Sequence, residues 1–157
     1  MKAIVSIKDV VNEMDVLSDE HSAFLNRHTG ELVTLSNEEI SAAEEDENID
    51  EYPEWQQDMI LKAKEVINSD DYLALPSKFE IHEYHIMEEF CHTVEDDNIS
   101  GNLLDKIRGR GAFSRFKNAI RMNGIEEEWY RFRQEELEKI AIEWLEANEI
   151  SYTKNNS

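Results

Sequence analysis

Three of the chain's five histidines lie in one short segment, at spacings that could hold a metal ion. If residues 79–95 form a helix, four potential ligands share one face: His82, His85, Glu89 and His92. Imidazole and carboxylate groups one helical turn apart can converge on zinc or another divalent transition metal. The alternative is an ordinary solvated polar face, on which His and Glu are common. We favour this alternative, because the segment lacks the His-Glu-x-x-His spacing that supplies two ligands and a general base.

A second segment concentrates positive charge in an otherwise acidic chain. Residues 105–121 hold six basic residues and one acidic residue, although the whole chain has 36 acidic residues against 16 Lys plus Arg. A glycine-containing turn there would expose backbone amides at a helix N-terminus, where phosphate or carboxylate groups bind favourably. The candidate residues for binding an anion or a partner are Arg108, Arg110, Ser114, Arg115, Lys117 and Arg121.

Two alternatives to an anion site remain for this basic segment. The side chains can pair within the chain, with acidic neighbours or with the acidic segment 36–58, and we favour this interpretation. Nucleic-acid binding is the least favoured, because a net charge of −20 repels it and because Phe113 and Phe116 have the spacing of core residues.

We assign no catalytic residue and no cofactor beyond the metal considered above. The chain lacks a Gly-x-Ser-x-Gly elbow, a phosphate-binding glycine loop ending in Lys-Ser/Thr and a dinucleotide fingerprint. Cys91, the single cysteine, lies on an apolar helix side and is predicted to be a buried, inert thiol. Arg133 should find a carboxylate or an aromatic ring, and Arg27 should pair with Glu31 across a hairpin loop.

Length and composition favour an ordinary globular protein. The chain has 157 residues, 40% of them hydrophobic, which is enough for one domain with a sizeable core. It has no apolar run long enough to span a bilayer and no secretory pattern at its start, and its single cysteine fits a reducing compartment. We therefore expect a cytoplasmic protein that does not bind membranes.

The first half of the chain predicts helices around a small sheet. Ser6 is a suitable N-cap for a first helix of about ten residues. Alternating segments at 22–26 and 31–35 predict a hairpin, with Gly30 in its loop. The acidic stretch 36–54 reads as a short capped helix and a connector that could be flexible. A helix over 54–68 and a third strand over 72–75 follow.

The second half predicts helices throughout. Apolar residues at helical spacing indicate helices over 79–95, 99–107 and 112–122, and a last helix that starts at Glu126. Core positions are expected at Tyr84, Met87, Phe90, Cys91, Val94, Phe113, Phe116, Ile120 and Trp129. The predicted fold is α+β and mainly helical, with five or six helices packed against a two- or three-stranded antiparallel sheet near the N-terminus. Residues 1–150 should form a single domain and residues 151–157 a C-terminal tail.

Five sequence blocks, read together, resemble a known bacterial family. They are NRHTGELV (26–33), KFEIHEYHIMEEFC (78–91), IRGRGAFSRFK (107–117), EEWYRFR (127–133) and IEWLE (142–146). In order and spacing they resemble uncharacterised protein family 0158. The resemblance implies a bacterial, cytoplasmic protein without an assigned activity, and it brings no catalytic residues.

The sequence favours a non-enzymatic interaction or regulatory module with a charge-polarised surface, acidic over residues 36–58 and basic around 108–121. The expected partner is a protein, and a basic one for the acidic surface; no oligomeric state is favoured. One alternative is a metal-dependent hydrolase or phosphate-handling enzyme that uses the His/Glu face. Another is an acidic nucleic-acid mimic, which would occupy the basic groove of a DNA- or RNA-binding partner.

Overall fold

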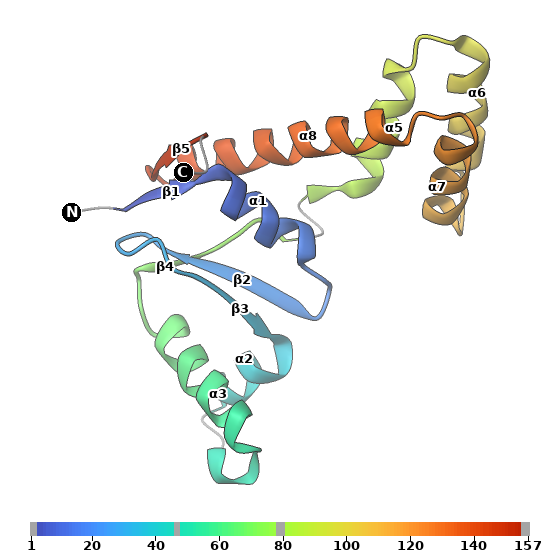
Figure 1. The fold of residues 1–157 in the computed structure, drawn as a ribbon. Coiled ribbons are helices and arrows are strands. Elements are labelled where there is room, and N and C mark those ends of the chain that lie inside the picture. Colours follow the sequence, from blue (N-terminus) through green and yellow to red (C-terminus); the bar gives the residue numbers. More distant parts are fainter. Residues whose placement is uncertain (1–2, 46–47, 78–80, 155–157) are drawn as a thin grey trace. The chain divides into compact units, whose positions relative to one another are not determined.

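The computed structural model describes residues 3–45, 48–77 and 81–154 (Figure 1). Within these residues the chain forms seven α-helices, one 3-10 helix and five short strands. It is mainly helical with a small antiparallel sheet, as predicted, but it has at least one more helix than the five or six expected. It divides into two compact units. Met1–Glu80 together with Ile140–Ser157 form the sheet unit, and Ile81–Lys139 form the helical unit. The expectation that residues 1–150 form a single domain stays a prediction.

The sheet is built on a hairpin. Strands β2 (His21–Asn26) and β3 (Leu32–Ser36) pair antiparallel, and β4 (Tyr72–Ala74) adds to the other edge of β2, in the order β3-β2-β4. The loop turns at Gly30, whose φ of +80° is one that residues other than glycine rarely adopt. Asn26 Oδ1 also accepts hydrogen bonds from the backbone amides of His28 and Thr29, at 2.8 and 3.1 Å. The predicted hairpin and third strand are confirmed.

The alternation of side chains gives the sheet two covered faces. Phe24 and Val33 face one another across the hairpin, and Val33 and Leu35 form a core with buried residues of α2 (Asn37–Glu44) and α3 (Glu54–Ile67). Thr34, on the opposite face, donates a hydrogen bond to Glu13 of α1 (Ile7–Val16) at 2.8 Å. Figure 1 shows α2 and α3 on one side of this sheet and α1 on the other.

Local capping sets where two of these helices begin. The Ser6 hydroxyl accepts from the amide of Asp9, as predicted for the start of α1. Ser36 and Glu39 form a capping box that starts α2. The 3-10 helix η1 (Ile49–Glu51) precedes α3. Residues 46–47 lie outside the described part, so the flexibility expected of the acidic connector stays a prediction.

The two ends of the chain meet in a second, two-stranded sheet. Strand β1 (Ile4–Ser6) pairs parallel with β5 (Ser151–Thr153), with Val5 opposite Tyr152. Residues 151–153, expected to belong to a C-terminal tail, form a strand of the sheet unit. The pairing was not predicted, because three-residue strands separated by most of the chain leave no local pattern.

The helical unit contains α5 (Glu83–Thr93), α6 (Asp97–Lys106), α7 (Ala112–Met122) and the start of α8 (Glu126–Ala147). Its core is aromatic: the Phe90 ring lies 6.1 Å from that of Phe116, 5.4 Å from that of Trp129 and 5.5 Å from that of Phe132. Edge-to-face packing of this kind adds to the stability gained from burial. The predicted start of α5 at residue 79 lies outside the described residues.

Two aromatic residues that were expected in the core are exposed. Tyr84 on α5 is 46% exposed and Phe113 on α7 is 45% exposed. On the same two helices, Ile86 and Ala112 are buried. In the part of the chain that the structure describes, no helix combines the length and apolar character needed to cross a bilayer.

Candidate functional site

The basic segment forms the turn between α6 and α7 and the outer face of α7. The turn contains Gly109 and Gly111, which both have a φ near +75°. Arg115 folds back over this turn. Its Nε donates to the carbonyl of Lys106 at 2.8 Å, and its two terminal nitrogens donate to the carbonyls of Arg108 and Arg110.

These contacts give Arg115 a role that the sequence did not suggest. Carbonyl groups at the end of a helix lack intrahelical partners, and a guanidinium group can satisfy several of them at once. Arg115 therefore fixes the turn that carries Arg108 and Arg110. It positions the candidate binding residues, and three of its donors are already used by this chain.

The remaining candidates are exposed, and we call them the α7 basic face: Arg108, Arg110, Ser114, Lys117 and Arg121. Arg121 Nε lies 3.4 Å from Glu126 Oε2. Within the described residues, the side chains of Arg108, Arg110 and Lys117 form no ion pair. In the part of the chain that the structure describes, the pairing that we favoured from the sequence is thus seen only at Arg121.

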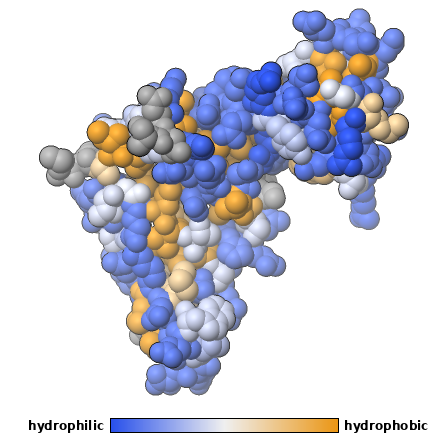
Figure 2. Space-filling view, in the orientation of Figure 1, coloured by the Kyte–Doolittle hydropathy of each residue, from blue (hydrophilic) through white to orange (hydrophobic). Residues whose placement is uncertain are grey.

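Apolar side chains border this basic face. Phe113 is 45% exposed and Met122 is 86% exposed. Figure 2 shows hydrophobic atoms exposed among hydrophilic ones over α6 and α7. Aromatic, Met and Arg side chains are enriched where proteins contact one another, whereas a solvated helix face rarely exposes them together.

A recess of about 360 Å³ lies between α6 and α7, beside the basic face. Two cations, three amides and two apolar residues line it: Lys106, Arg115, Asn102, Asn118, Asn123, Ala119 and Met122. Sequence reasoning missed the recess, because asparagines on two separate helices carry no motif. The spacing of Asn118 and Asn123, on α7 and at its end, indicates a polar helix face. It gives no sign that these residues lie close to α6.

Charge is distributed unequally between the two units. Ile81–Lys139 carries 13 acidic and 9 basic residues, a net of −4, whereas the sheet unit carries 23 acidic and 7 basic residues, a net of −16. The basic face therefore lies in the less acidic unit. Its own unit carries a net charge of only −4, whereas the whole chain carries −20.

The four residues of the His/Glu face lie on α5 and just before it. His82 precedes the helix in the left-handed region, with φ of 55°, and its carbonyl accepts from His85 and Ile86. His85 Nε2 lies 3.7 Å from Glu89 Oε1, and both side chains are more than half exposed. Among the described residues, no three His, Cys, Asp or Glu side chains are grouped closely enough to hold a metal ion.

Three predicted structural roles can be compared with the contacts observed. Arg133 pairs with Glu83 of α5, which confirms that it needs a carboxylate. Cys91 is fully buried, and burial raises the pKa of its thiol to about 11, as expected of an inert cysteine. The Arg27–Glu31 pair was wrong, because Glu31 has other partners.

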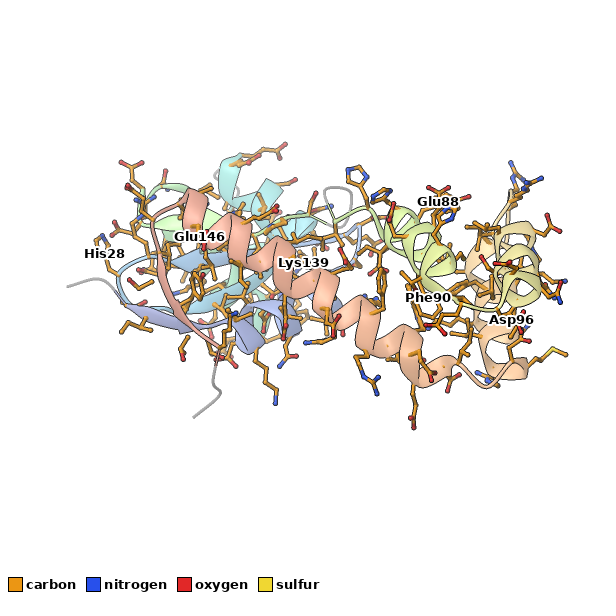
Figure 3. All side chains as sticks on the ribbon, turned by 90° about the horizontal axis from the view of Figure 1, so that it is seen from above. His28, Glu88, Phe90, Asp96, Lys139 and Glu146 are labelled. Atoms are coloured by element: carbon orange, nitrogen blue, oxygen red, sulfur yellow. The ribbon has the colours of Figure 1, made fainter. Side chains whose placement is uncertain are left out.

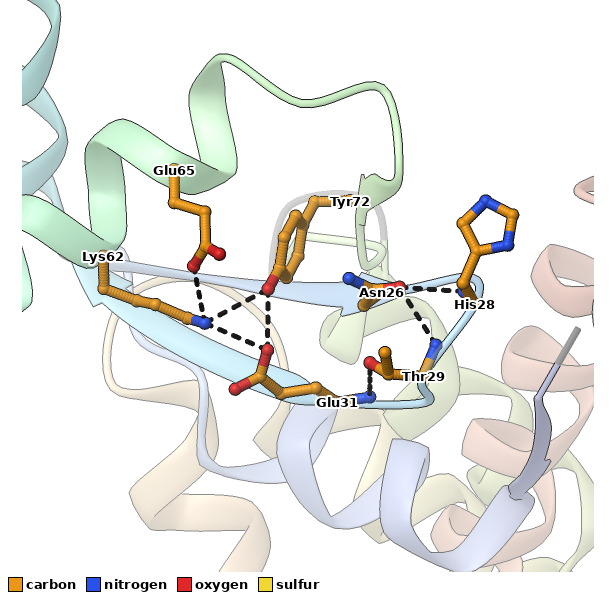
Figure 4. Close-up of polar contacts among 7 residues, drawn as sticks. All are labelled: Asn26, His28, Thr29, Glu31, Lys62, Glu65 and Tyr72. Atoms are coloured by element: carbon orange, nitrogen blue, oxygen red, sulfur yellow. Dashed lines mark hydrogen bonds and ion pairs between the residues drawn. The ribbon is translucent and has the colours of Figure 1, made fainter.

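Glu31 belongs to a cluster that joins the hairpin loop to α3 and β4 (Figure 4). Tyr72 Oη donates to its carboxylate at 2.6 Å, and Lys62 Nζ lies 3.0 Å from the same oxygen. Lys62 Nζ also lies 2.7 Å from Glu65. The Tyr72 hydroxyl, followed by Lys62, lowers the pKa of Glu31, and hydrogen bonds to Glu65, Tyr72 and Glu31 raise the pKa of Lys62. All four side chains are satisfied by one another, so we interpret the cluster as structural.

Comparisons with known proteins agree with the resemblance seen in the sequence. The model of an uncharacterised protein family, UPF0158, matches residues 2–157. A curated UPF0158 protein of Pseudomonas aeruginosa is 30% identical over 66 residues, which cover 41% of this chain and 43% of that relative. The chain thus matches less than half the length of this relative. No solved structure matches the chain.

Proposed function

We propose that this chain, which belongs to the uncharacterised protein family UPF0158, is a non-enzymatic interaction module of the cytoplasm that binds an acidic protein partner. The binding surface in this proposal is the α7 basic face, together with the exposed rings and chains of Phe113 and Met122. Arg115 supports this surface indirectly, because its hydrogen bonds hold in place the turn that carries Arg108 and Arg110.

The observation that carries the proposal is that three of the four cations on the basic face, Arg108, Arg110 and Lys117, form no ion pair within the described residues, in a chain with 36 acidic residues. A cation on an exposed helix gains about 0.2–1 kcal/mol from a neighbouring carboxylate, and such neighbours are abundant here. Within the described residues Arg108, Arg110 and Lys117 nevertheless have none. They therefore keep their full charge for a partner, and binding need not break internal pairs first.

Charge also bears on the class of partner. A nucleic-acid duplex carries one negative charge per about 1.7 Å along its axis. All parts of the duplex near this chain, whose net charge is −20, would therefore be repelled. An acidic protein segment presents its carboxylates only where it touches the basic face. Phe113 and Met122 add the apolar contacts that protein partners use.

A charge-reversal experiment tests the proposal. The double variant Arg110→Glu/Lys117→Glu changes two exposed residues of the basic face. The matched control is Lys8→Glu/Lys154→Glu, which changes the net charge equally at exposed sites in the sheet unit. Each tagged protein is returned to its own cells, isolated gently, and weighed by native mass spectrometry with its bound material.

We expect the parent protein and the control to retain a stoichiometric protein partner that is released by salt, and the R110E/K117E variant to lose it. Identical complexes from all three proteins would refute the proposal. So would a bound mass that disappears on nuclease treatment, because the basic face would then serve a nucleic acid.

A further inference from the structure

A second surface of the helical unit has the opposite charge. A groove of about 480 Å³ lies between α8 and the junction of α5 with α6. Its floor is apolar and consists of Phe90, Val94, Ile99, Ile125 and Phe132. Phe90, labelled in Figure 3, belongs to its floor, and Asp96, also labelled there, belongs to its rim. This volume is within the range of pockets that hold a few side chains or a small ligand.

The rim of the groove is acidic. Four carboxylates and one guanidinium border it: Glu95, Asp96, Glu128, Glu135 and Arg131. Asp96 accepts hydrogen bonds from the amides of Asn98 and Ile99 at the start of α6, which keeps its carboxylate in place. Within the described residues, the side-chain carboxylates of Glu95, Glu128 and Glu135 form no ion pair or hydrogen bond. The rim therefore has a net negative charge that the chain itself does not neutralise.

One wall of the groove is the helix α8, and the other consists of the end of α5, the junction and the start of α6. Glu128, Arg131, Phe132 and Glu135 follow one another at helical spacing along one face of α8. Opposite them, Phe90 near the end of α5 is held by its contacts with Phe116 and Trp129. The apolar floor and the acidic rim are thus fixed relative to one another within the helical unit, so a ligand would meet a preformed surface.

We infer that this groove binds a basic amphipathic segment of a partner protein, with apolar side chains on the floor and Lys or Arg side chains against the rim. Charge complementarity points to this occupant. An apolar ligand alone would leave the rim carboxylates unpaired, and an acidic segment would be repelled by them. An amphipathic helix with apolar anchors one turn apart matches the spacing of the α8 residues that line the groove.

The groove and the α7 basic face are different surfaces with opposite charge. Binding at the groove does not depend on the function proposed above. The two can fail separately, because Arg110→Glu/Lys117→Glu changes no residue of the groove.

The test uses the full chain and a synthetic helical peptide of leucine and lysine, about four turns long, carrying a fluorescent label. Two further peptides replace either every lysine with glutamate or every leucine with serine. Binding is measured by fluorescence anisotropy. The Glu128→Gln/Glu135→Gln variant removes two rim charges, and Glu127→Gln/Glu138→Gln removes two charges from the same helix that do not line the groove.

We expect the leucine–lysine peptide to bind the parent chain and both other peptides to bind much more weakly. E128Q/E135Q should weaken binding about five- to tenfold, because each exposed pair contributes up to about 1 kcal/mol. E127Q/E138Q should bind as the parent does. In NMR spectra, methyl signals of Val94, Ile99 and Ile125 should shift on titration, while that of the buried Leu103 should stay in place.

Several results would overturn the inference. They are no binding of the leucine–lysine peptide, equal loss in both Glu→Gln variants, or shifts confined to methyls outside the groove. If the peptide with serine in place of every leucine binds equally well, the binding is non-specific charge attraction and the apolar floor has no role in it. Comparable binding of hexylammonium ion would assign the groove to a small organic cation. Self-association of the unliganded chain that E128Q/E135Q abolishes would assign it to a second copy.

Discussion

The pair between Arg133 and Glu83 should be the strongest single ion pair of the helical unit. It joins α8 to the start of α5, it is bidentate, and its side chains are only 20% and 15% exposed. Two charges at this range attract by about 4 kcal/mol at an effective dielectric constant near 20. Desolvation and lost side-chain freedom offset roughly half of this attraction. We therefore expect a coupling free energy of about 2 kcal/mol.

A double-mutant cycle measures this coupling. Arg133→Met and Glu83→Gln are made singly and together, so that other contacts of Arg133 cancel. The background carries Trp55→Phe and Trp144→Phe, which leaves the buried Trp129 as the fluorescent probe of the helical unit. Urea unfolding then gives the free energy of each variant.

The exposed pair of Lys139 with Glu136 provides a matched control. Its nitrogen and oxygen lie 3.1 Å apart, but the Lys139 side chain is 68% exposed, so a second cycle should give only about 0.3 kcal/mol. A coupling for Arg133 and Glu83 no larger than this control would refute the argument that their burial makes the pair strong.

Four further outcomes follow from local structure. Gly111→Ala should destabilise the chain by about 1–2 kcal/mol in urea unfolding, because φ is +75° and a Cβ would lie 3.0 Å from a guanidinium nitrogen. Gly101→Ala, mid-helix with open space around it, should stabilise it by about 0.5–1 kcal/mol. Because the pKa of Cys91 is raised from 9.0 to about 11 in the folded chain, the stability that the protonated thiol contributes is complete below pH 9.0 and is lost as the pH rises to about 11. In Cys91→Ala, the free energy of unfolding measured in urea should therefore depend less on pH in that range. The lowered pKa of Glu31 gives stability that is lost on acidification below about pH 4.5, so Tyr72→Phe should reduce this loss in acid titrations of stability.

The sequence predicted those parts of the fold that local chemistry determines. Ser6 as a cap, Gly30 in the hairpin loop and Pro53 before α3 each act on their immediate neighbours, so their effects can be read from adjacent residues. The third strand was predicted because Tyr72 begins a short apolar run that ends at Pro76. These elements lie within two or three residues of their predicted bounds.

Contacts between distant residues were not predictable in this way. Glu31 was expected to pair with its neighbour Arg27, but Tyr72 and Lys62, which are distant in sequence, bind it instead. Phe113 has the spacing of a core residue, yet helix position alone cannot tell the edge of a buried face from its centre.

The candidate site was predicted as a set of residues and not as an arrangement. The sequence placed Arg115 among the binding residues, because it lies within the basic run. Its actual role depends on the path of the backbone at Gly109 and Gly111, which brings three carbonyls within reach. The acidic-rimmed groove was missed for a similar reason, because its two walls lie about 30 to 40 positions apart in the printed sequence.

The central claim is that the outer face of α7 contacts an acidic protein in the cell. Site-specific photo-crosslinking tests it most directly, with a photoreactive amino acid at Ser114 on this face and, as a control, at the exposed Asn12 of α1. The account predicts a single crosslinked protein from Ser114, acidic at the site of attachment and absent from Asn12. Crosslinks to nucleic acid, or the same products from both positions, would contradict it.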